Sequence, residues 1–313
     1  MSTAPSGDAR IEGAVLDHVA HAVPRWQDVW YRYATDLGAE WNSGGPGPGF
    51  APAQLRFANA ARVEVLMPWD VGINDFLSRF LAASGPGPHH LTFKVPDLEV
   101  AIDRVRSFGI APIGISFADP EWMECFLHPK LASGVVVQLA QQRVAWRSDP
   151  PEDYPTERRR RADGTGPVPP AALLHVCHVV ADLGAALDLF GGLLGGTVTA
   201  VGTADGLHWV DLAWAGPLGV RLVGPTVGDP DGPVPRALGG LPGRVHHLRM
   251  EVEEPGGVPG VAPATSLFGT LDGRGAESGV CEISRADNAG LGIVLQPAPP
   301  AAEGASERAP EDR

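Results

Sequence analysis

The 313-residue sequence predicts an α+β fold of two tandem domains, each made of paired β-α-β-β-β modules. Three observations predict this fold: a long repeat, a shorter repeat inside the first half, and apolar residues that alternate as in half-buried strands. The length agrees with it, since a domain commonly takes ~150 residues.

The long repeat aligns the two halves of the chain. His-Val-Ala-His at residues 18–21 corresponds to His-Val-Cys-His at 175–178, an offset of 157 residues. The same offset carries His-His-Leu at 89–91 onto His-His-Leu at 246–248. Because the intervening loops have almost the same length in both halves, the repeat indicates a duplication of the whole unit.

Helices are expected at matching places in the two halves. Apolar residues at 26, 30, 33 and 37 lie on one helix face, and the same offset finds apolar residues at 183, 187, 190 and 194. Gly38 and Gly195 follow, where a glycine commonly ends a helix. The chain therefore predicts one helix after the first strand of each half.

A finer repeat lies inside the first half, where His18, Pro24 and Gly38 match His90, Pro96 and Gly109. A second helix is expected from an N-cap at Asp97 to about Gly109. In the fourth module the corresponding stretch, 254–260, contains two prolines and three glycines. These residues oppose a regular helix, so this module is predicted to be degenerate, with its helix lost or shortened.

These patterns place a first domain at 14–142, a linker at 143–170, a second, degenerate domain at 171–298 and a disordered tail at 299–313. The four arginines at 158–161 fall in the linker and are expected to be solvated.

The composition narrows the classes of function. Hydrophobic residues make up 44% of the chain and the net charge is −13, which argues against nucleic acid or an anionic membrane as the main partner. Neither a signal peptide nor an apolar run of ~20 residues is visible. The three separated cysteines indicate free thiols. The sequence therefore favours a cytoplasmic monomer or homodimer that acts on a small molecule.

Alternation in four strands directs four ligand-type side chains to one face of a sheet. Successive side chains of a strand face opposite sides. In each strand the apolar residues take the face expected to carry a packed helix. The same pattern puts Asp17 on that face, opposite its neighbour. The other face carries His18, Glu64, His90 and Gln138.

The two histidines begin the two modules of the first domain, and Glu64 and Gln138 end them. A pseudo-twofold pairing of the modules would bring these four side chains together. Two imidazoles, a carboxylate and an amide oxygen suit Mn, Fe, Co, Ni or Zn. The sequence therefore predicts one divalent metal in the first domain.

The equivalent residues of the second domain are His175, Arg221, His247 and Gln296. A guanidinium is permanently charged and cannot ligate a metal. This domain is therefore expected to be metal-free and to serve as a scaffold, a lid or a surrogate for a dimer partner. A separate anion pocket built on Arg221 and Arg249 is the alternative.

Four segments carry a resemblance to a known family: Leu-Asp-His-Val at 16–19, Val-Glu-Val-Leu at 63–66, Gly-Pro-Gly-Pro-His-His-Leu at 85–91 and Phe-Leu-His-Pro-Lys at 126–130. Over residues 15–142 the chain resembles the methylmalonyl-CoA epimerase family, within the vicinal-oxygen-chelate superfamily of glyoxalases, bleomycin-resistance proteins and dioxygenases. The resemblance implies a divalent metal that binds two neighbouring substrate oxygens. It transfers the ligand positions to His18, Glu64, His90 and Gln138.

The chain departs from that family where a catalytic base is expected. Gln138 stands where the family has a glutamate, and 47–54 contains no acid. Glu64 is the remaining carboxylate of the ligand set, and Glu121 and Glu124 are the candidate replacement bases. Thr92 and Lys94 share a strand face with His90 and are candidate substrate contacts.

Three functions remain open at this point. The first is a metal-dependent isomerase or lyase that acts on a small oxygenated metabolite, an oxo-acid or a thioester, by metal-stabilised enolate chemistry. The second is a non-haem iron dioxygenase, because two histidines and one carboxylate form the ligand pattern of that class. The third is a non-catalytic binding or resistance protein, which would bind a small molecule without turnover.

Overall fold

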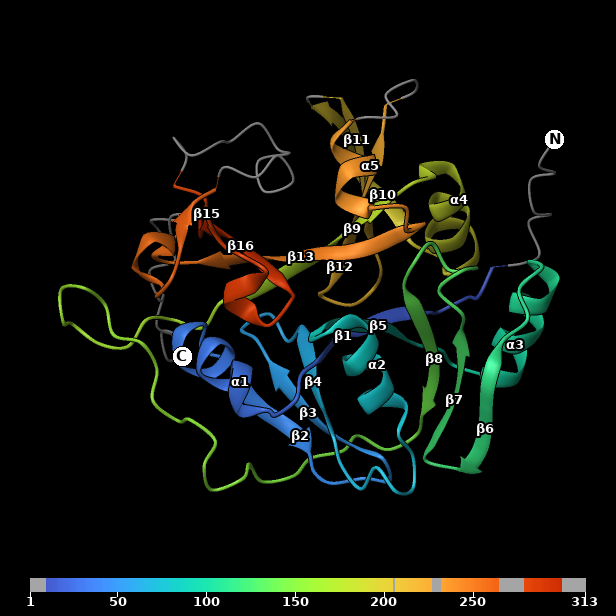
Figure 1. The fold of residues 1–313 in the computed structure, drawn as a ribbon, viewed down its shortest axis with the longest axis horizontal. Helices are drawn as coiled ribbons and strands as arrows, with labels where there is room; N and C mark the ends of the chain where they lie inside the picture. The colour runs from blue at the N-terminus through green and yellow to red at the C-terminus, as the bar shows by residue number, and fades with distance from the viewer. Residues whose placement is uncertain (1–9, 205, 227–231, 265–278, 300–313) are drawn as a thin grey trace, which may run out of the picture.

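The computed structural model describes residues 10–204, 206–226, 232–264 and 279–299. It contains two eight-stranded sheets, one from each half of the chain, and Figure 1 shows them stacked with the first below the second. The tail predicted to be disordered lies outside the described residues from position 300 onward. No helix in the described ranges is long and apolar enough to cross a membrane.

The first sheet has the strand order β2-β3-β4-β1-β5-β8-β7-β6. Each module contributes four neighbouring strands, and β1 and β5 join the modules as an antiparallel pair. This arrangement confirms the predicted paired modules. The strands are β1 (Val15–Ala22), β2 (Glu40–Gly44), β3 (Phe50–Arg56), β4 (Arg62–Pro68), β5 (Gly87–Lys94), β6 (Ile113–Asp119), β7 (Trp122–Leu127) and β8 (Val136–Gln142).

The second sheet repeats this order as β10-β11-β12-β9-β13-β16-β15-β14. Its strands are β9 (Ala172–Val180), β10 (Thr197–Ala204), β11 (Leu207–Ala213), β12 (Gly219–Pro225), β13 (Gly243–Val252), β14 (Ala262–Pro263), β15 (Cys281–Ile283) and β16 (Gly292–Pro297). The two sheets agree with the predicted duplication, and we propose domain limits of 14–142 and 171–298.

The helices lie where the repeats predict them. The first is α1 (Gln27–Trp30), which continues as a π-helical turn, η1 (Tyr31–Asp36); its counterpart is α4 (Leu183–Leu187) followed by η2 (Asp188–Leu193). In the second module, Asp97 accepts a hydrogen bond from the Val100 N–H and begins α3 (Leu98–Ser107). The fourth module keeps a three-residue turn, η3 (Pro255–Gly257), which confirms its degeneracy.

Two short helices were not predicted. They are α2 (Phe76–Ser84), between β4 and β5, and α5 (Pro233–Leu238), at the matching place in the second domain. A further turn, η5 (Ala286–Asn288), precedes β16. The apolar faces of both sheets and the helices that cover them form one continuous core, in which the Phe93 and Trp214 rings lie 5.1 Å apart.

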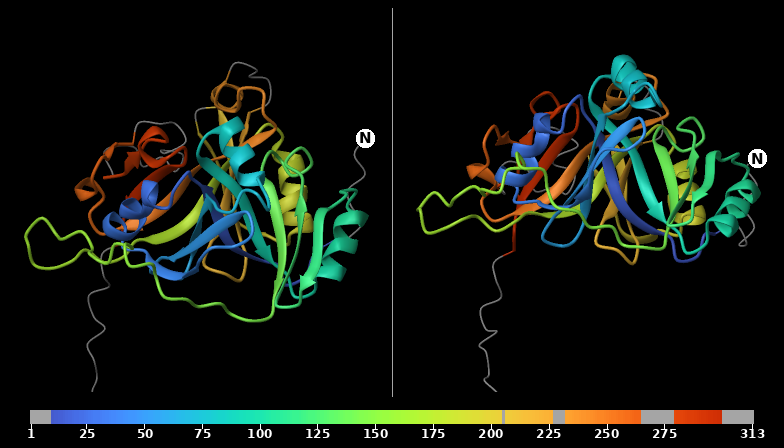
Figure 2. Two further views of the ribbon diagram at one scale, coloured as in Figure 1. Left: turned by 60° about the horizontal axis from the view of Figure 1, so that its bottom comes forward. Right: turned by 90° about the horizontal axis from the view of Figure 1, so that it is seen from below.

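A pair of equivalent contacts joins the two domains. The His21 Nε2–H donates to the Ala289 carbonyl oxygen at 2.9 Å, and the His178 Nε2–H donates to the Ser133 carbonyl oxygen at 2.8 Å. Beside them the backbones touch so closely that a Cβ at Gly290 would lie 1.9 Å from the Pro86 oxygen. The domains therefore meet through a pseudo-twofold interface. The turned views in Figure 2 show α1 beside the C-terminal elements and α3 beside α4.

The linker is more closely bound to the domains than expected. Tyr154 is buried and donates its hydroxyl to the Ala39 carbonyl oxygen at 2.9 Å. The arginine run was predicted to be solvated, and this is wrong for Arg159. Arg161 pairs with Glu253 at 2.5 Å, and the Arg159 side chain is only 10% exposed beside Glu254. Glu253 and Glu254 of the second domain form ion pairs with these two arginines. Composition alone does not reveal such contacts.

Candidate metal centre

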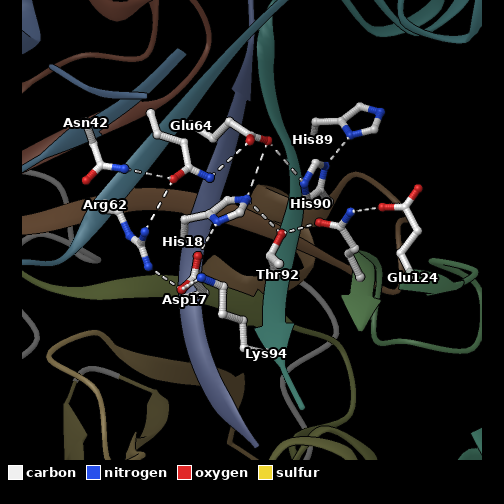
Figure 3. A network of polar contacts seen from close by, with 12 residues as sticks. Asp17, His18, Asn42, Arg62, Glu64, His89, His90, Thr92, Lys94 and Glu124 are labelled. Atoms are coloured by element: carbon white, nitrogen blue, oxygen red, sulfur yellow. Dashed lines mark hydrogen bonds and ion pairs between the residues drawn. The ribbon is translucent and has the colours of Figure 1, made fainter. Parts of the chain in front are cut away.

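Four adjacent strands in the middle of the first sheet carry the predicted ligands. Their order is β4-β1-β5-β8, and each supplies one residue of the set Glu64, His18, His90 and Gln138. In β4, Val63 and Val65 are fully buried on the helix side, so alternation turns the glutamate between them to the other side. Figure 3 shows the side chains of His18, Glu64 and His90 converging above β1 and β5.

The side chains of His18, Glu64 and His90 offer three ligand atoms that all lie within 4.8 Å of one another. The Glu64 Oε2 is 3.4 Å from the His18 Nε2 and 3.7 Å from the His90 Nε2. Both imidazoles are buried, and the Glu64 carboxylate is 12% exposed. Among the described residues this is the single cluster of three histidine, cysteine or acidic side chains with such spacing.

A β-bulge brings Asp17 to the site, contrary to the prediction that it faces the helices. Between Leu16 and His18 the pairing of β1 with β5 skips one residue, so Asp17 is extra and the alternation breaks there. Its Oδ2 accepts the His18 Nδ1–H at 2.8 Å. The carboxylate also pairs with Arg62 and with the Lys94 Nζ, the latter at 2.9 Å.

Protonation of the imidazoles follows from these contacts. Burial alone would lower the pKa of His18, but Glu64 and the hydrogen bond to Asp17 raise that pKa to about 9. Burial holds the pKa of His90 well below its ordinary value, and its neighbour His89 adds to the effect. In the metal-free chain a proton on His18 therefore supplies the positive charge that lies between two carboxylates.

These residues fit a divalent cation. The His90 Nε2 is buried and has no hydrogen-bond partner among the described residues. The His90 Nδ1 lies 2.8 Å from the His89 Nδ1, so a proton between these two atoms leaves the Nε2 lone pair free. Asp17 orients His18 in the same way, with its Nε2 toward Glu64. Two neutral imidazoles and one carboxylate are suitable ligands for zinc, iron or manganese.

Thr92, Gln138 and Glu124 continue the network across the sheet. The Thr92 hydroxyl lies 2.9 Å from the His18 Nε2 and donates to the Gln138 Oε1 at 2.5 Å. The Gln138 Nε2 donates to the Glu124 Oε2 at 2.6 Å, and the Trp122 Nε1 donates to the same oxygen at 2.7 Å. Glu124 therefore contacts the predicted ligand Gln138 directly, and Figure 3 shows Glu124 at one end of this network.

The structure does not bring every candidate to the site. Glu121 is exposed at the turn between β6 and β7, one residue before β7 begins at Trp122. Lys94 points away from Glu64 toward Asp17, whose charge holds it at the far side of His18. Thr92 is completely buried beneath the cluster, where it orders protein groups and has no exposed surface to offer a substrate.

Two further residues at the site were missed by sequence reasoning. His89 faces the cavity because a second bulge interrupts the β1–β5 pairing between Val19 and His21. The Gln54 Nε2 donates to the Glu64 Oε1 at 3.4 Å. Gln54 lies directly opposite Glu64 in the β3–β4 pairing, so a correct strand register would have found it.

A cavity of about 760 Å³ opens from the cluster. Glu64, His90, Gln138 and Glu124 line its inner end. Most of the remaining wall is apolar and aromatic. The aromatic side chains that contribute are Phe50, Phe76, Trp122, Phe126 and Trp146.

The second domain has a different centre at the matching place. Arg221 makes two hydrogen bonds to the Asp211 carboxylate, at 2.6 and 2.7 Å, and its guanidinium stacks 4.3 Å from the Trp209 ring centroid. The Arg249 Nε donates to the Gln296 Oε1 at 2.7 Å. His175 has a pKa well below its ordinary value because of burial and then the charge of Arg221.

Comparison with known proteins identifies the family. Residues 17–126 match the Glyoxalase/Bleomycin resistance protein/Dioxygenase superfamily. An ethylmalonyl-CoA/methylmalonyl-CoA epimerase from Cereibacter sphaeroides is 32% identical over 135 residues, which cover 40% of this chain and 96% of the relative. The chain belongs to this superfamily. Members of the superfamily typically bind a divalent metal ion.

One solved structure shares the architecture of almost the whole chain. A mutant form of 4-hydroxymandelate synthase from Streptomyces coelicolor is 15% identical to this chain, with a TM-score of 0.60. The match covers 91% of this chain and 92% of that chain. This match shows a shared two-domain fold. Methylmalonyl-CoA epimerase from Mycobacterium tuberculosis is 27% identical with a TM-score of 0.38, and the match covers 42% of this chain and 89% of that one.

Proposed function

We propose that the first domain binds one divalent metal ion through His18, Glu64 and His90, with the Gln138 oxygen beside them, and that the protein is an isomerase or lyase. Its substrate is a small molecule with two neighbouring oxygens. The observation that carries the proposal is the buried cluster of two imidazoles and one carboxylate at the inner end of a cavity. A cation held there would act as a Lewis acid toward negative charge on the substrate oxygens.

Glu124 is the base that this arrangement favours. Its carboxylate lines the cavity, and hydrogen bonds from Gln138 and Trp122 fix its position. In the proposed step Glu124 takes a proton from the carbon next to a substrate carbonyl, and the electron pair of the C–H bond moves onto the substrate oxygen. Gln138 cannot perform this transfer, because an amide does not accept a proton at neutral pH.

The number of carboxylates distinguishes between reactions. Among the described residues that line the cavity, the carboxylates are those of Glu64 and Glu124. If Glu64 holds the metal, one base remains. A single base suits a proton shift between two atoms of the substrate, or the elimination of a leaving group. The similarity to a CoA-ester epimerase supports proton removal next to a carbonyl, although a two-base epimerisation lacks its second acid here.

Deuterium exchange tests this function without knowledge of the product. Metal-loaded protein is incubated in D₂O with a panel of small oxo-acids and thioesters, and loss of the C–H signal is followed by NMR. We expect exchange in the wild type and no exchange in Glu124→Gln, which keeps its metal. Glu64→Ala is expected to lose both metal and exchange. Glu121→Gln, the same change at the exposed turn, serves as the control. Full exchange in Glu64→Ala would contradict the proposal.

A dioxygenase is the second candidate. The ligand set of two histidines and one carboxylate is the set that non-haem iron oxygenases use, and it leaves coordination positions open. Oxygen consumption by iron(II)-loaded protein, measured with the same panel plus a catechol, discriminates between the two functions. Uptake that depends on both iron and an organic substrate would favour the dioxygenase, and its absence would favour the isomerase or lyase.

A further inference from the structure

The segment that follows β8 forms the outer wall of the cavity. Trp146, Arg147 and Ser148 belong to the stretch that joins the two domains, and all three line the cavity. In Figure 1 the chain after β8 runs beneath the first domain from the β8 side toward β2. This segment contacts β2 of the first module and Trp122 of β7 in the second module, so it bridges the two modules at the cavity.

Polar contacts fix this wall to β2. Arg147 donates a hydrogen bond to the Asn42 Oδ1. The Ser148 hydroxyl accepts the Gly44 N–H at 2.9 Å and donates to the Gly44 carbonyl oxygen at 3.0 Å. It also lies 3.3 Å from the Trp41 Nε1. A segment tied to the sheet at successive residues has a defined position, so it can shape a binding site.

The wall completes an aromatic surface next to the proposed base. The Trp146 and Trp122 rings lie 5.1 Å apart at an angle of 30°, and the Trp122 Nε1 holds the Glu124 carboxylate at 2.7 Å. Phe126 lines the cavity from the same strand as Trp122. A flat apolar group on these rings would therefore lie beside both the base and the ligand cluster.

The charges of the cavity restrict the substrate further. Among its described lining residues, Arg147 is the one guanidinium or ammonium group. A coenzyme A thioester carries several phosphate charges and would meet one cationic side chain in this cavity. A compact molecule with a single carboxylate would match it.

We infer that the substrate is a compact aromatic molecule with two neighbouring oxygens and one negative charge, such as an aromatic 2-oxo acid, and that Trp146 is a specificity-determining residue. This inference rests on the proposed function, since the substrate oxygens would face the metal. The segment after β8, which carries Trp146, lies beyond residues 17–126 that match the superfamily.

Isothermal titration of zinc-loaded protein tests the inference with three probes. Benzoylformate has an aromatic ring and neighbouring oxygens, and it has no hydrogen on the carbon next to its keto group, so the proposed step cannot consume it. Pyruvate lacks the ring, and benzoyl-CoA replaces the carboxylate with the thioester. We expect benzoylformate to bind on the order of tenfold more tightly than pyruvate. We expect it to bind more tightly than benzoyl-CoA as well.

Trp146→Ala is expected to weaken benzoylformate binding roughly 3- to 10-fold and to leave pyruvate binding unchanged. Trp146→Phe should restore most of the preference. Trp69→Ala removes a similarly exposed tryptophan outside the cavity and should have no effect. An unchanged preference in Trp146→Ala, or tighter binding of benzoyl-CoA, would overturn the inference. Zinc content measured on the same samples separates this outcome from a failure of the metal site itself.

Discussion

In the first domain Glu64 contacts the two strand histidines, His18 and His90. Arg221 occupies the equivalent position in the second domain. Around Glu64 the neighbouring groups are neutral or positive: Gln54 and the imidazoles of His18 and His90. Around Arg221 the partner opposite is Asp211, which takes the register position of Gln54. Glu64 therefore lies among neutral or positive groups, and Arg221 lies next to a negative one.

One scaffold thus satisfies the same buried position in two ways. A buried carboxylate beside imidazoles needs a positive charge, which a proton or a metal supplies. A buried guanidinium carries that charge itself, and Asp211 neutralises it. The second domain therefore keeps the fold and its two histidines, while an arginine stands where the first domain has Glu64. We propose that it binds no metal and acts as a scaffold.

Conversion of the first centre into the second should have the largest effect. Glu64→Arg removes a ligand and places a permanent charge between the histidines. We expect bound metal to fall from one ion per chain to none, and deuterium exchange to fall more than about 100-fold. Metal analysis and NMR measure the two quantities. Glu40→Arg, the same change on the exposed edge strand β2, should alter neither. Glu64→Gln, which keeps the side-chain shape, separates loss of the ligand from loss of the fold.

The reverse conversion should create a site. The triple change Asp211→Gln, Arg221→Glu and Arg249→Thr copies Gln54, Glu64 and Thr92 into the second domain. With His175 and His247 already in place, we expect zinc binding to rise from one to two ions per chain. Equilibrium dialysis measures this stoichiometry. Arg221→Ala alone supplies no carboxylate and should leave it at one. A stoichiometry of one in the triple variant would show that the backbone of the second domain no longer positions the ligands.

Asp17 tests a smaller difference, because its equivalent in the second domain is Leu174. Asp17→Asn keeps the shape of the side chain and removes the charge that orients His18. We expect zinc to bind about 10- to 100-fold more weakly, as measured by competition with a chelator. Asp97→Asn changes the N-cap of α3, where asparagine caps equally well, and is the matched control. Unchanged affinity in Asp17→Asn would mean that packing alone orients His18.

Acid should weaken the interface between the domains. Burial lowers the pKa of His178 from an ordinary 6.5 to about 4, and the same holds for His21. Because the folded-state pKa lies below the unfolded one, each histidine stabilises the fold fully above about pH 6.5, and this contribution is lost as the pH falls toward 4. The free energy of unfolding should fall by about 1.4 kcal/mol per pH unit for each histidine.

Urea unfolding between pH 4.5 and 7 measures this dependence. His178→Gln should reduce the slope of unfolding free energy against pH by about 1.4 kcal/mol per pH unit, the contribution of one histidine. His21→Gln should have the same effect. His128→Gln changes an exposed histidine and should leave the slope unaltered. Equal slopes in all three variants would show that these two imidazoles do not control the acid sensitivity of the interface.

The sequence by itself determined the duplicated fold and the faces of the regular strands. Alternation and helix spacing are local, so Val63 and Val65 reveal which way Glu64 points, and Asp97 reveals where a helix begins. Repetition extended these local signals to the second domain. It also showed that Arg221 stands where a ligand would be, and that 254–260 cannot form a regular helix.

Only the tertiary structure decided which groups surround those residues. The bulges that turn Asp17 and His89 toward the site depend on the register between β1 and β5, which a single strand does not encode. The pairing of Lys94 with Asp17 and the wall formed by Trp146 likewise join residues far apart in the chain. Such contacts arise from how strands and linker pack in three dimensions, and a period of two residues carries no information about them.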